Sequence, residues 1–266
     1  MTNPKALVLR TAGINCDAET VRALDGAGAP TDLFHLSKMI AEPGRFDDYG
    51  ILVIPGGFSY GDDVAAGRIF SAELVHNLSN ELVNFVDRGG LVLGICNGFQ
   101  VLVETGLLDS SVGKRTDRKI ALYDNASMKF EARWVNLRSE ESACPWLESG
   151  EIWPVPVAHA EGRFVCRDDE TLTALKANGQ VALRYVNPDG STPGYPDCPN
   201  GAVEEIAGIC DPTGRVLGLM PHPERNLLPW NHPQWTRMQA RSEGEGAGFF
   251  RRLVDVAKSS IASPSI

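Results

Sequence analysis

Residues 91–104 constrain the possible fold of this chain more than any other stretch. They read as a short apolar strand, a sharp turn at Cys96 and an apolar helix. Gly94 and Gly98 flank the cysteine in the pattern G-x-C-x-G, the thiol form of a nucleophile elbow, whose tight turn leaves no room for bulky neighbours. A thiol at a helix N-terminus feels the positive end of the helix dipole, which favours the thiolate. Cys96 is therefore a candidate nucleophile; the alternative is a buried cysteine in a glycine-rich turn.

The first hundred residues alternate between apolar strands and helices. Strands are expected at 5–10, 30–35, 50–55 and 91–95, and helices at 17–28, capped by Asp17, and 72–88. This alternation predicts an α/β fold with a doubly wound, mostly parallel sheet flanked by helices, in which ligands bind beyond the carboxyl ends of the strands. The loops expected together at that edge are 11–16, 56–63 and 96–98.

The second half of the chain has a different pattern. Further strands are indicated at 128–135, 152–157 and 180–186, followed by a hairpin at 203–220 that turns at 211–214. These segments predict an antiparallel β portion joined to the first half. A terminal helix is expected at 246–262, and the whole chain, 1–266, reads as a single domain with a C-terminal extension at about 226–266.

Composition excludes several classes of protein. The net charge is -9 and the pI is near 5.1, which argues against a general nucleic-acid or anionic-membrane surface. No apolar run approaches the ~18 residues of a membrane span, and no export signal is recognisable, so we expect a cytoplasmic protein. The six cysteines show no C-x-x-C spacing, and we predict no metal site and no disulfide framework.

His222 and Glu224 form a second candidate site. Residues i and i+2 of an extended segment project to the same side, and Pro221 and Pro223 are expected to keep the backbone out of the helical region. A carboxylate beside an imidazole fixes its tautomer and stabilises the imidazolium. The segment follows the second hairpin strand, which should end at the same sheet edge as Cys96. A Cys-His-Glu triad is therefore predicted; the alternative is a surface turn.

Two further clusters have competing interpretations. His159 and Glu161 offer two metal-type ligands without a third at suitable spacing, so a loop that lines the pocket is favoured over a metal motif. Asn15, Cys16 and Asp17 are either a reactive site or a helix cap preceded by a loop cysteine.

These motifs together resemble the class I, triad-type glutamine amidotransferases, and within that class the glutaminase subunits of phosphoribosylformylglycinamidine synthase. The resemblance rests on blocks at 13–20, 55–63, 66–68, 94–100, 158–164 and 220–225. Ala160 stands where the fourth block commonly has glycine, and extra sequence is present around 110–150 and 226–245.

The resemblance implies a role for each matching residue. Cys96 would attack the side-chain amide of glutamine, His222 would carry the proton to ammonia, and Glu224 would hold His222. The oxyanion hole would consist of the backbone N–H of Asn97 and one from Gly57 or Phe58. The residues implied in positioning glutamine are Gln100, His159, Glu161 and Gly162.

The resemblance also implies partners. L-glutamine would be hydrolysed through a cysteinyl thioester, and ammonia would pass through a channel to a synthetase subunit, with a small bridging subunit also expected. ATP and Mg would be bound by the synthetase, and no cofactor is expected in this chain, which has no G-x-x-x-x-G-K-[ST]. The alternatives are a glutaminase for another synthetase or a non-catalytic regulatory subunit of the same fold.

Overall fold

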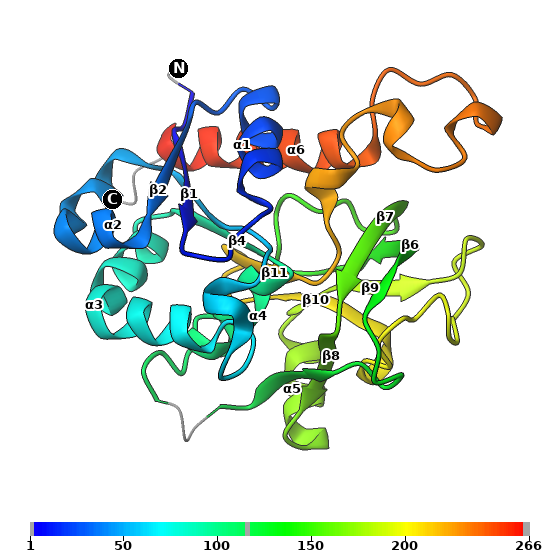
Figure 1. Cartoon of the computed structure of the whole chain (residues 1–266), viewed down its shortest axis with the longest axis horizontal. Helices are drawn as coiled ribbons and strands as arrows, with labels where there is room; N and C mark the ends of the chain where they lie inside the picture. Colours follow the sequence, from blue (N-terminus) through cyan, green and yellow to red (C-terminus); the bar gives the residue numbers. More distant parts are fainter. Residues whose placement is uncertain (1–2, 115–117, 263–266) are drawn as a thin grey trace.

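A computed structural model describes residues 3–114 and 118–262. These residues contain a nine-stranded sheet in the order β2-β1-β3-β4-β11-β10-β9-β6-β7, and a separate ribbon of β5 and β8 (Figure 1). The predicted α/β class is confirmed, and the antiparallel strands of the second half continue the same sheet. Within the described residues, no helix is long and apolar enough to cross a membrane.

The parallel half of the sheet contains the four strands predicted in the first half of the chain. Its members, in spatial order, are β2 (Thr31–His35), β1 (Ala6–Arg10), β3 (Ile51–Ile54), β4 (Leu91–Ile95) and β11 (Val216–Leu219). All residues of β3, β4 and β11 are buried, because helices cover both faces of the sheet.

The antiparallel half of the sheet continues beside β11. It consists of β10 (Ile206–Cys210), β9 (Val181–Val186), β6 (Glu131–Ser139) and β7 (Ile152–His159). The strand predicted from 128 begins later, because Met128 has a φ of 56° and the side chain of Asn125 donates to the carbonyl of Lys129 at 2.9 Å, which closes a turn. The loop predicted at 159–164 is also wrong: most of it is strand β8 (Glu161–Cys166), paired with β5 (Ile120–Asp124).

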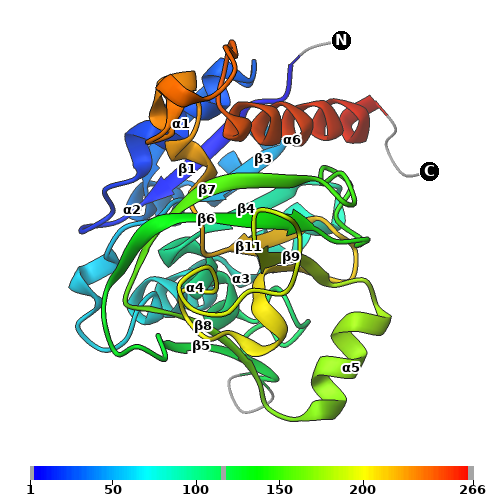
Figure 2. The ribbon, with the colours of Figure 1, turned by 90° about the vertical axis from the view of Figure 1, so that its right-hand side faces the viewer.

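Helices cover both faces of the sheet. In Figures 1 and 2, α1 (Asp17–Gly26) and α6 (Glu245–Ala262) lie above the sheet, and α3 (Arg68–Asp87) and α4 (Asn97–Thr105) lie below it. The other two α-helices of the described residues are α2 (Leu36–Ala41) and α5 (Asp169–Ala177). Asp17 is not the cap of α1, as predicted, but its first residue: Cys16 occupies the cap position and Asp17 pairs with Arg10 at 2.9 Å.

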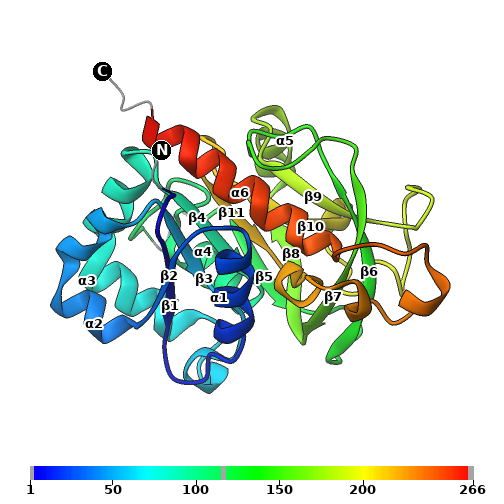
Figure 3. The same cartoon turned by 90° about the horizontal axis from the view of Figure 1, so that it is seen from above.

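The C-terminal part of the chain has two different structures. Residues 228–240, with two short 3-10 turns (Pro229–Asn231 and Trp235–Arg237), are mostly exposed and project from the body of the protein, whereas α6 lies along it (Figure 3). Phe249 and Phe250 of α6 are fully buried, and the Phe249 ring packs 5.9 Å from that of Trp153. The helix therefore belongs to the hydrophobic core.

The position of β11 determines the site. Although β11 follows the antiparallel strands in sequence, it pairs in parallel with β4, and Leu219 lies opposite Ile95. The amide of Cys96 donates to the carbonyl of Leu219 at 2.8 Å. Consequently, the residues after β11 and the turn after β4 leave the sheet side by side.

Candidate active site

Cys96 occupies a strained turn between β4 and α4. Its φ of 52° and ψ of -107° are rare for a residue with a side chain, and such strain persists only where the surroundings enforce it. A Cβ on Gly98 would lie 1.8 Å from the carbonyl oxygen of Ile54, and one on Gly94 would lie 2.6 Å from that of Gly98. The predicted elbow is present, and both glycines are required by the close approach of β3, β4 and α4.

His222 and Glu224 form a buried hydrogen-bonded pair. Nδ1 of His222 lies 2.6 Å from Oε1 of Glu224, and the two residues are 1% and 2% exposed. The predicted extended geometry is wrong, because Pro223 begins a 3-10 turn (Pro223–Arg225) in which the two side chains still meet. Proline is compatible with the first position of such a turn, where its missing N–H is not needed. The amide of His222 donates to the carbonyl of Pro156 at 2.8 Å, which fixes the segment against β7.

The surroundings of His222 favour its charged form. Burial alone would lower the pKa of the imidazole, but the carboxylate of Glu224 and the neighbouring sulfur atoms of Cys96 and Cys16 outweigh it and hold the pKa well above its usual value. An imidazolium beside a cysteine at a helix N-terminus is an arrangement suited to nucleophilic catalysis.

Gly56 lies at the centre of this arrangement and was not singled out from the sequence. A Cβ at this position would lie 2.8 Å from Cε1 of His222, 3.1 Å from Sγ of Cys16 and 3.4 Å from Cβ of Cys96. The two sulfur-bearing residues and the imidazole thus converge on one glycine. The glycine-rich pattern after β3 was a signal for close approach, but it did not indicate which groups would approach.

The loop after β3 supplies candidate oxyanion donors. Gly57 forms a bridge with Ile14 and has a φ of 143°, which favours glycine. The amide of Phe58 donates to the carbonyl of Gly13 at 3.0 Å and is therefore engaged. Of the two residues considered from the sequence, Gly57 is thus the better donor. Asn97, the first residue of α4, contributes a backbone amide of the helix N-terminus.

Gln100 is held at both ends of its side-chain amide. Its oxygen accepts a hydrogen bond from Asn97 Nδ2 at 3.0 Å, and its nitrogen donates to the carbonyl of Glu161. The side chain of Asn97 also donates to Asp62 at 3.1 Å and accepts from the amide of Ser59 at 3.3 Å. These bonds connect α4 to β8 and to the loop after β3. Gln100 therefore orients the walls of the site.

His159 is a buried neutral side chain. Burial, and secondarily the positive charge of His222, lowers its pKa to about 3. Its Nδ1 lies 3.0 Å from Oδ1 of Asn125, a fully buried residue whose role was missed because nothing near it in sequence marks it. A Cβ on Gly162 would lie 2.7 Å from Nδ1 of His159, so the glycine makes room for the ring.

Glu161 faces a cavity of about 640 Å³, together with Arg68, Arg118, Tyr123 and Asp124. Burial raises the pKa of the Glu161 carboxyl, and a backbone hydrogen bond from Ala66 opposes this effect. Since the backbone carbonyl of Glu161 accepts a hydrogen bond from the side chain of Gln100, the cavity adjoins helix α4. It offers both acidic and basic groups to a zwitterionic ligand.

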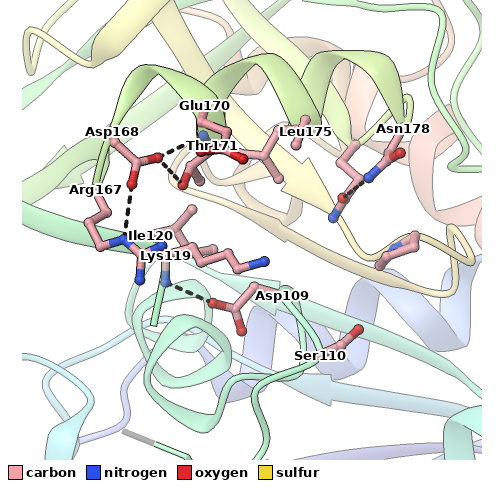
Figure 4. Close-up of a pocket in the computed structure, with 13 residues that line it drawn as sticks. Asp109, Ser110, Lys119, Ile120, Arg167, Asp168, Glu170, Thr171, Leu175 and Asn178 are labelled. Atoms are coloured by element: carbon pink, nitrogen blue, oxygen red, sulfur yellow. Dashed lines mark hydrogen bonds and ion pairs between the residues drawn. The ribbon is translucent and has the colours of Figure 1, made fainter. Parts of the chain in front are cut away.

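Figure 4 shows another cavity, of about 370 Å³, beside α5. Several of its charged groups are engaged in local structure: Arg167 donates to Asp168 at 3.1 Å, and Asp168 accepts from the amide of Thr171 at 2.8 Å as the cap of α5. The amide of Lys119 donates to Asp109 at 3.1 Å. Among the described residues that line this cavity there is no predicted site residue, so the candidate active site lies elsewhere.

Comparison with known proteins identifies the class. Residues 3–255 match the family model of the CobB/CobQ-like glutamine amidotransferase domain. The match includes Cys96, His222 and Glu224. Fold and site thus define a glutamine amidotransferase.

Comparison with individual relatives identifies the family of this chain within the class. Phosphoribosylformylglycinamidine synthase subunit PurQ of Methanococcus maripaludis strain S2 is 44% identical over 234 residues, covering 87% of this chain and 86% of the relative. The protein of that name from Dehalococcoides mccartyi is 39% identical over 261 residues, covering 97% and 99%. A solved "Structure of PurLQS from Thermotoga maritima" has 34% identity, a TM-score of 0.71 and coverage of 96% and 99%. The chain therefore belongs to the PurQ family, which confirms the resemblance noted from its motifs.

Proposed function

We propose that this protein hydrolyses L-glutamine to glutamate and ammonia, and supplies the ammonia to the synthetase that converts formylglycinamide ribonucleotide to formylglycinamidine ribonucleotide in purine biosynthesis. The observation that carries the proposal is the 2.6 Å His222–Glu224 pair placed, through the β4–β11 pairing, beside the strained Cys96. A nucleophile, a base and an orienting carboxylate are the groups that acyl transfer from an amide requires.

The reaction begins with attack of the Cys96 sulfur on the amide carbon of the glutamine side chain. The thiol proton is transferred to His222, and the carbonyl oxygen becomes an oxyanion that accepts hydrogen bonds from the backbone amides of Gly57 and Asn97. Each such donor lowers the barrier by about 3 kcal/mol. Collapse of this intermediate breaks the carbon–nitrogen bond while His222 returns its proton to the leaving ammonia. Water then attacks the thioester while His222 takes a proton of that water. The carbon–sulfur bond breaks, His222 returns the proton to the sulfur of Cys96, and glutamate leaves.

Glutamine would be held by the walls around the elbow. Glu161, in the cavity of about 640 Å³, is placed to bind the α-ammonium group of the substrate. Gln100 positions Glu161 through its backbone carbonyl, and His159 and Gly162 support the same β7–β8 turn. These three residues are therefore proposed as positioning residues of the glutamine site.

The synthetase would be a separate protein, since the solved relative named above is titled PurLQS. We propose that it carries ATP and Mg, that a small bridging subunit completes the complex, and that this chain acts as one domain in the cytoplasm. Of the alternatives, service to another synthetase would be revealed by failure to complement a purine auxotroph that lacks its own glutaminase subunit.

The first testable prediction concerns Gly56→Ala. The added Cβ would lie 2.8 Å from His222 and 3.4 Å from Cys96, so the triad must shift. We expect a loss in kcat/KM on the order of 10²-fold, since misplacement by ~1 Å has this cost, and destabilisation by about 1–3 kcal/mol. Gly26→Ala is the matched control, because nothing lies within 4 Å of its Cβ position. Equal glutamine hydrolysis by both variants would contradict the packing described here.

The second prediction concerns coupling to the synthetase. Free hydrolysis would waste glutamine, so we expect weak glutaminase activity for the chain alone and acceleration when the synthetase, the bridging subunit and their nucleotides are added. The loop 56–63 is the proposed moving part. In this structure the loop is held by two hydrogen bonds: the amide of Phe58 donates to the carbonyl of Gly13 at 3.0 Å, and the amide of Tyr60 donates to that of Ala12 at 2.8 Å. Glutamate release should be measured with and without partners; identical kcat/KM values would exclude partner gating.

A further inference from the structure

Cys16 is a buried thiol beside the triad for which the proposed reaction has no use. Sγ of Cys16 and ligand-type atoms of His222 and Glu224 all lie within 4.8 Å of one another. The three residues are 1%, 1% and 2% exposed. Among the described residues, these three form the single cluster of His, Cys, Asp or Glu side chains whose ligand atoms lie close enough together to hold a metal ion. Cys16 comes from the loop after β1, more than two hundred positions from the other two in sequence.

The backbone fixes Cys16 in this place. Its amide donates to the carbonyl of Gly56 at 3.2 Å, and the bridge between Ile14 and Gly57 holds the two loops together. Because Gly56 has no side chain, Sγ of Cys16 and the imidazole of His222 can both lie against its Cα. Sγ accepts a hydrogen bond from Nη2 of Arg225 at 3.0 Å and lies 3.3 Å from Oδ1 of Asn15.

Two polar atoms of the cluster have no partner. Nε2 of His222 and Oε2 of Glu224 are buried and make no hydrogen bond with any described residue. Buried polar atoms without partners cost free energy, and in native proteins they often mark a place where a ligand or ion completes the coordination. The orphaned oxygen of Glu224 is an observation independent of the position of Cys16, whereas the imidazole of His222 also interacts with the sulfur atoms of Cys16 and Cys96.

Thiolate, imidazole and carboxylate are the ligand types that Zn²⁺ prefers. We propose that Cys16, His222 and Glu224 form a site for a borderline-soft divalent cation such as Zn²⁺, and that its occupancy inhibits the glutaminase by binding the base. Ligand atoms of a tetrahedral zinc site lie roughly 3.5 Å apart. Nδ1 of His222 and Oε1 of Glu224 are 2.6 Å apart, so metal binding must separate these two atoms and replace their hydrogen bond. Binding releases two protons to solvent, that of the Cys16 thiol and the one that makes the His222 imidazole an imidazolium, and displaces the hydrogen bond of Cys16 from Arg225.

The local charge is compatible with a divalent cation. Glu224 and the Cys16 thiolate contribute two negative charges, and the sulfur of Cys96 lies near the same imidazole. Arg225 is the opposing cation, but its Nε already lies 3.3 Å from Oε1 of Glu19, which offers it a partner when it releases Cys16. The inhibitory consequence rests on the proposed function; the binding of the metal does not.

Inhibition of the glutaminase by Zn²⁺ tests the proposed effect of metal binding on activity. Glutamine hydrolysis should be titrated with Zn²⁺ for the wild type, Cys16→Ala and Cys144→Ala, each expressed relative to its own metal-free rate. We expect reversible inhibition of the wild type that a chelator removes. The inhibition constant should rise at least ~10-fold in Cys16→Ala, since even loss of an outer-sphere partner costs 10–100-fold in affinity, and should not change in Cys144→Ala. Equal inhibition of the wild type and Cys16→Ala would overturn the proposal.

A binding experiment separates this proposal from the proposed function. Co²⁺ should be added to Cys96→Ala, in which the nucleophile is absent but the three ligands remain. A thiolate-to-cobalt charge-transfer absorption at one equivalent is the expected result, and the added substitution Cys16→Ala should remove it. If the absorption is missing from Cys96→Ala, the site does not exist. If it is present while the wild type hydrolyses no glutamine, the metal site stands and the proposed function fails.

Discussion

Cys96→Ala is expected to reduce glutamine hydrolysis by a factor on the order of 10⁶, because removal of the nucleophile of a triad abolishes the contribution of all its members. The fold should remain, since Cys96 is small and the turn is imposed by the packing of Gly94 and Gly98. Glutamate release should be measured together with thermal unfolding. A variant that kept most of its hydrolysis would show that the triad assignment is wrong.

The same variant tests the division of labour between subunits. In the complex, Cys96→Ala should still support synthesis when ammonium salts replace glutamine, because only nitrogen supply is lost. Cys144→Ala is the matched control: it removes a buried thiol from the connection between β6 and β7 and should leave both reactions unchanged. A glutamine analogue that alkylates thiols should label Cys96 in the wild type. Absence of labelling with all partners present would favour a non-catalytic regulatory subunit.

Glu224→Gln should reduce kcat on the order of 10³- to 10⁴-fold, as neutralisation of the orienting carboxylate does in other triads. The amide can present a donor to Nδ1 of His222 and so favour the wrong tautomer. Glu148→Gln, a change of the same kind at an exposed side chain, is the control. If Glu224→Gln retained more than about a tenth of the activity, the 2.6 Å pair would not be needed for catalysis.

Glu224→Gln is also expected to change the free energy of unfolding in a pH-dependent way. Because the pKa of His222 is raised, the folded state binds its proton more tightly than the unfolded chain does. This contribution is fully present below the unfolded value of about 6.5 and is lost as the pH rises through the raised pKa. Urea unfolding should therefore show a difference between the wild type and Glu224→Gln that decreases with increasing pH.

Much of the fold could be predicted because its signals are local. The continuous apolar runs of β1, β3 and β4 are typical of buried parallel strands, and the elbow is written into five consecutive residues, 94–98. The hairpin of β10 and β11 was marked by its turn at 211–214. Because β11 ends directly before 222, the meeting of base and nucleophile at one edge followed from these local signals.

The remainder depends on contacts between distant segments. The position of Cys16 against His222 requires the bridge between Ile14 and Gly57, and neither loop specifies the other. Similarly, the hydrogen bond from Phe58 to Gly13, which engages one of the two candidate oxyanion amides, is formed across the same interface. Asn125, which follows β5, was missed because its partner, His159, lies at the end of β7, 34 positions away in sequence. Such pairings are decided by tertiary packing rather than by local sequence.

The pairing of β4 with β11 has a consequence for biosynthesis of the protein. A chain emerging from the ribosome carries its nucleophile long before residue 216, and until that point the central sheet lacks the strand to which Cys96 is hydrogen-bonded. Contacts this distant in sequence form late, after a large loss of chain entropy. A nascent polypeptide therefore contains Cys96 before it contains His222 and Glu224. We expect competence to consume glutamine to be acquired only after residues 216–224 have been added.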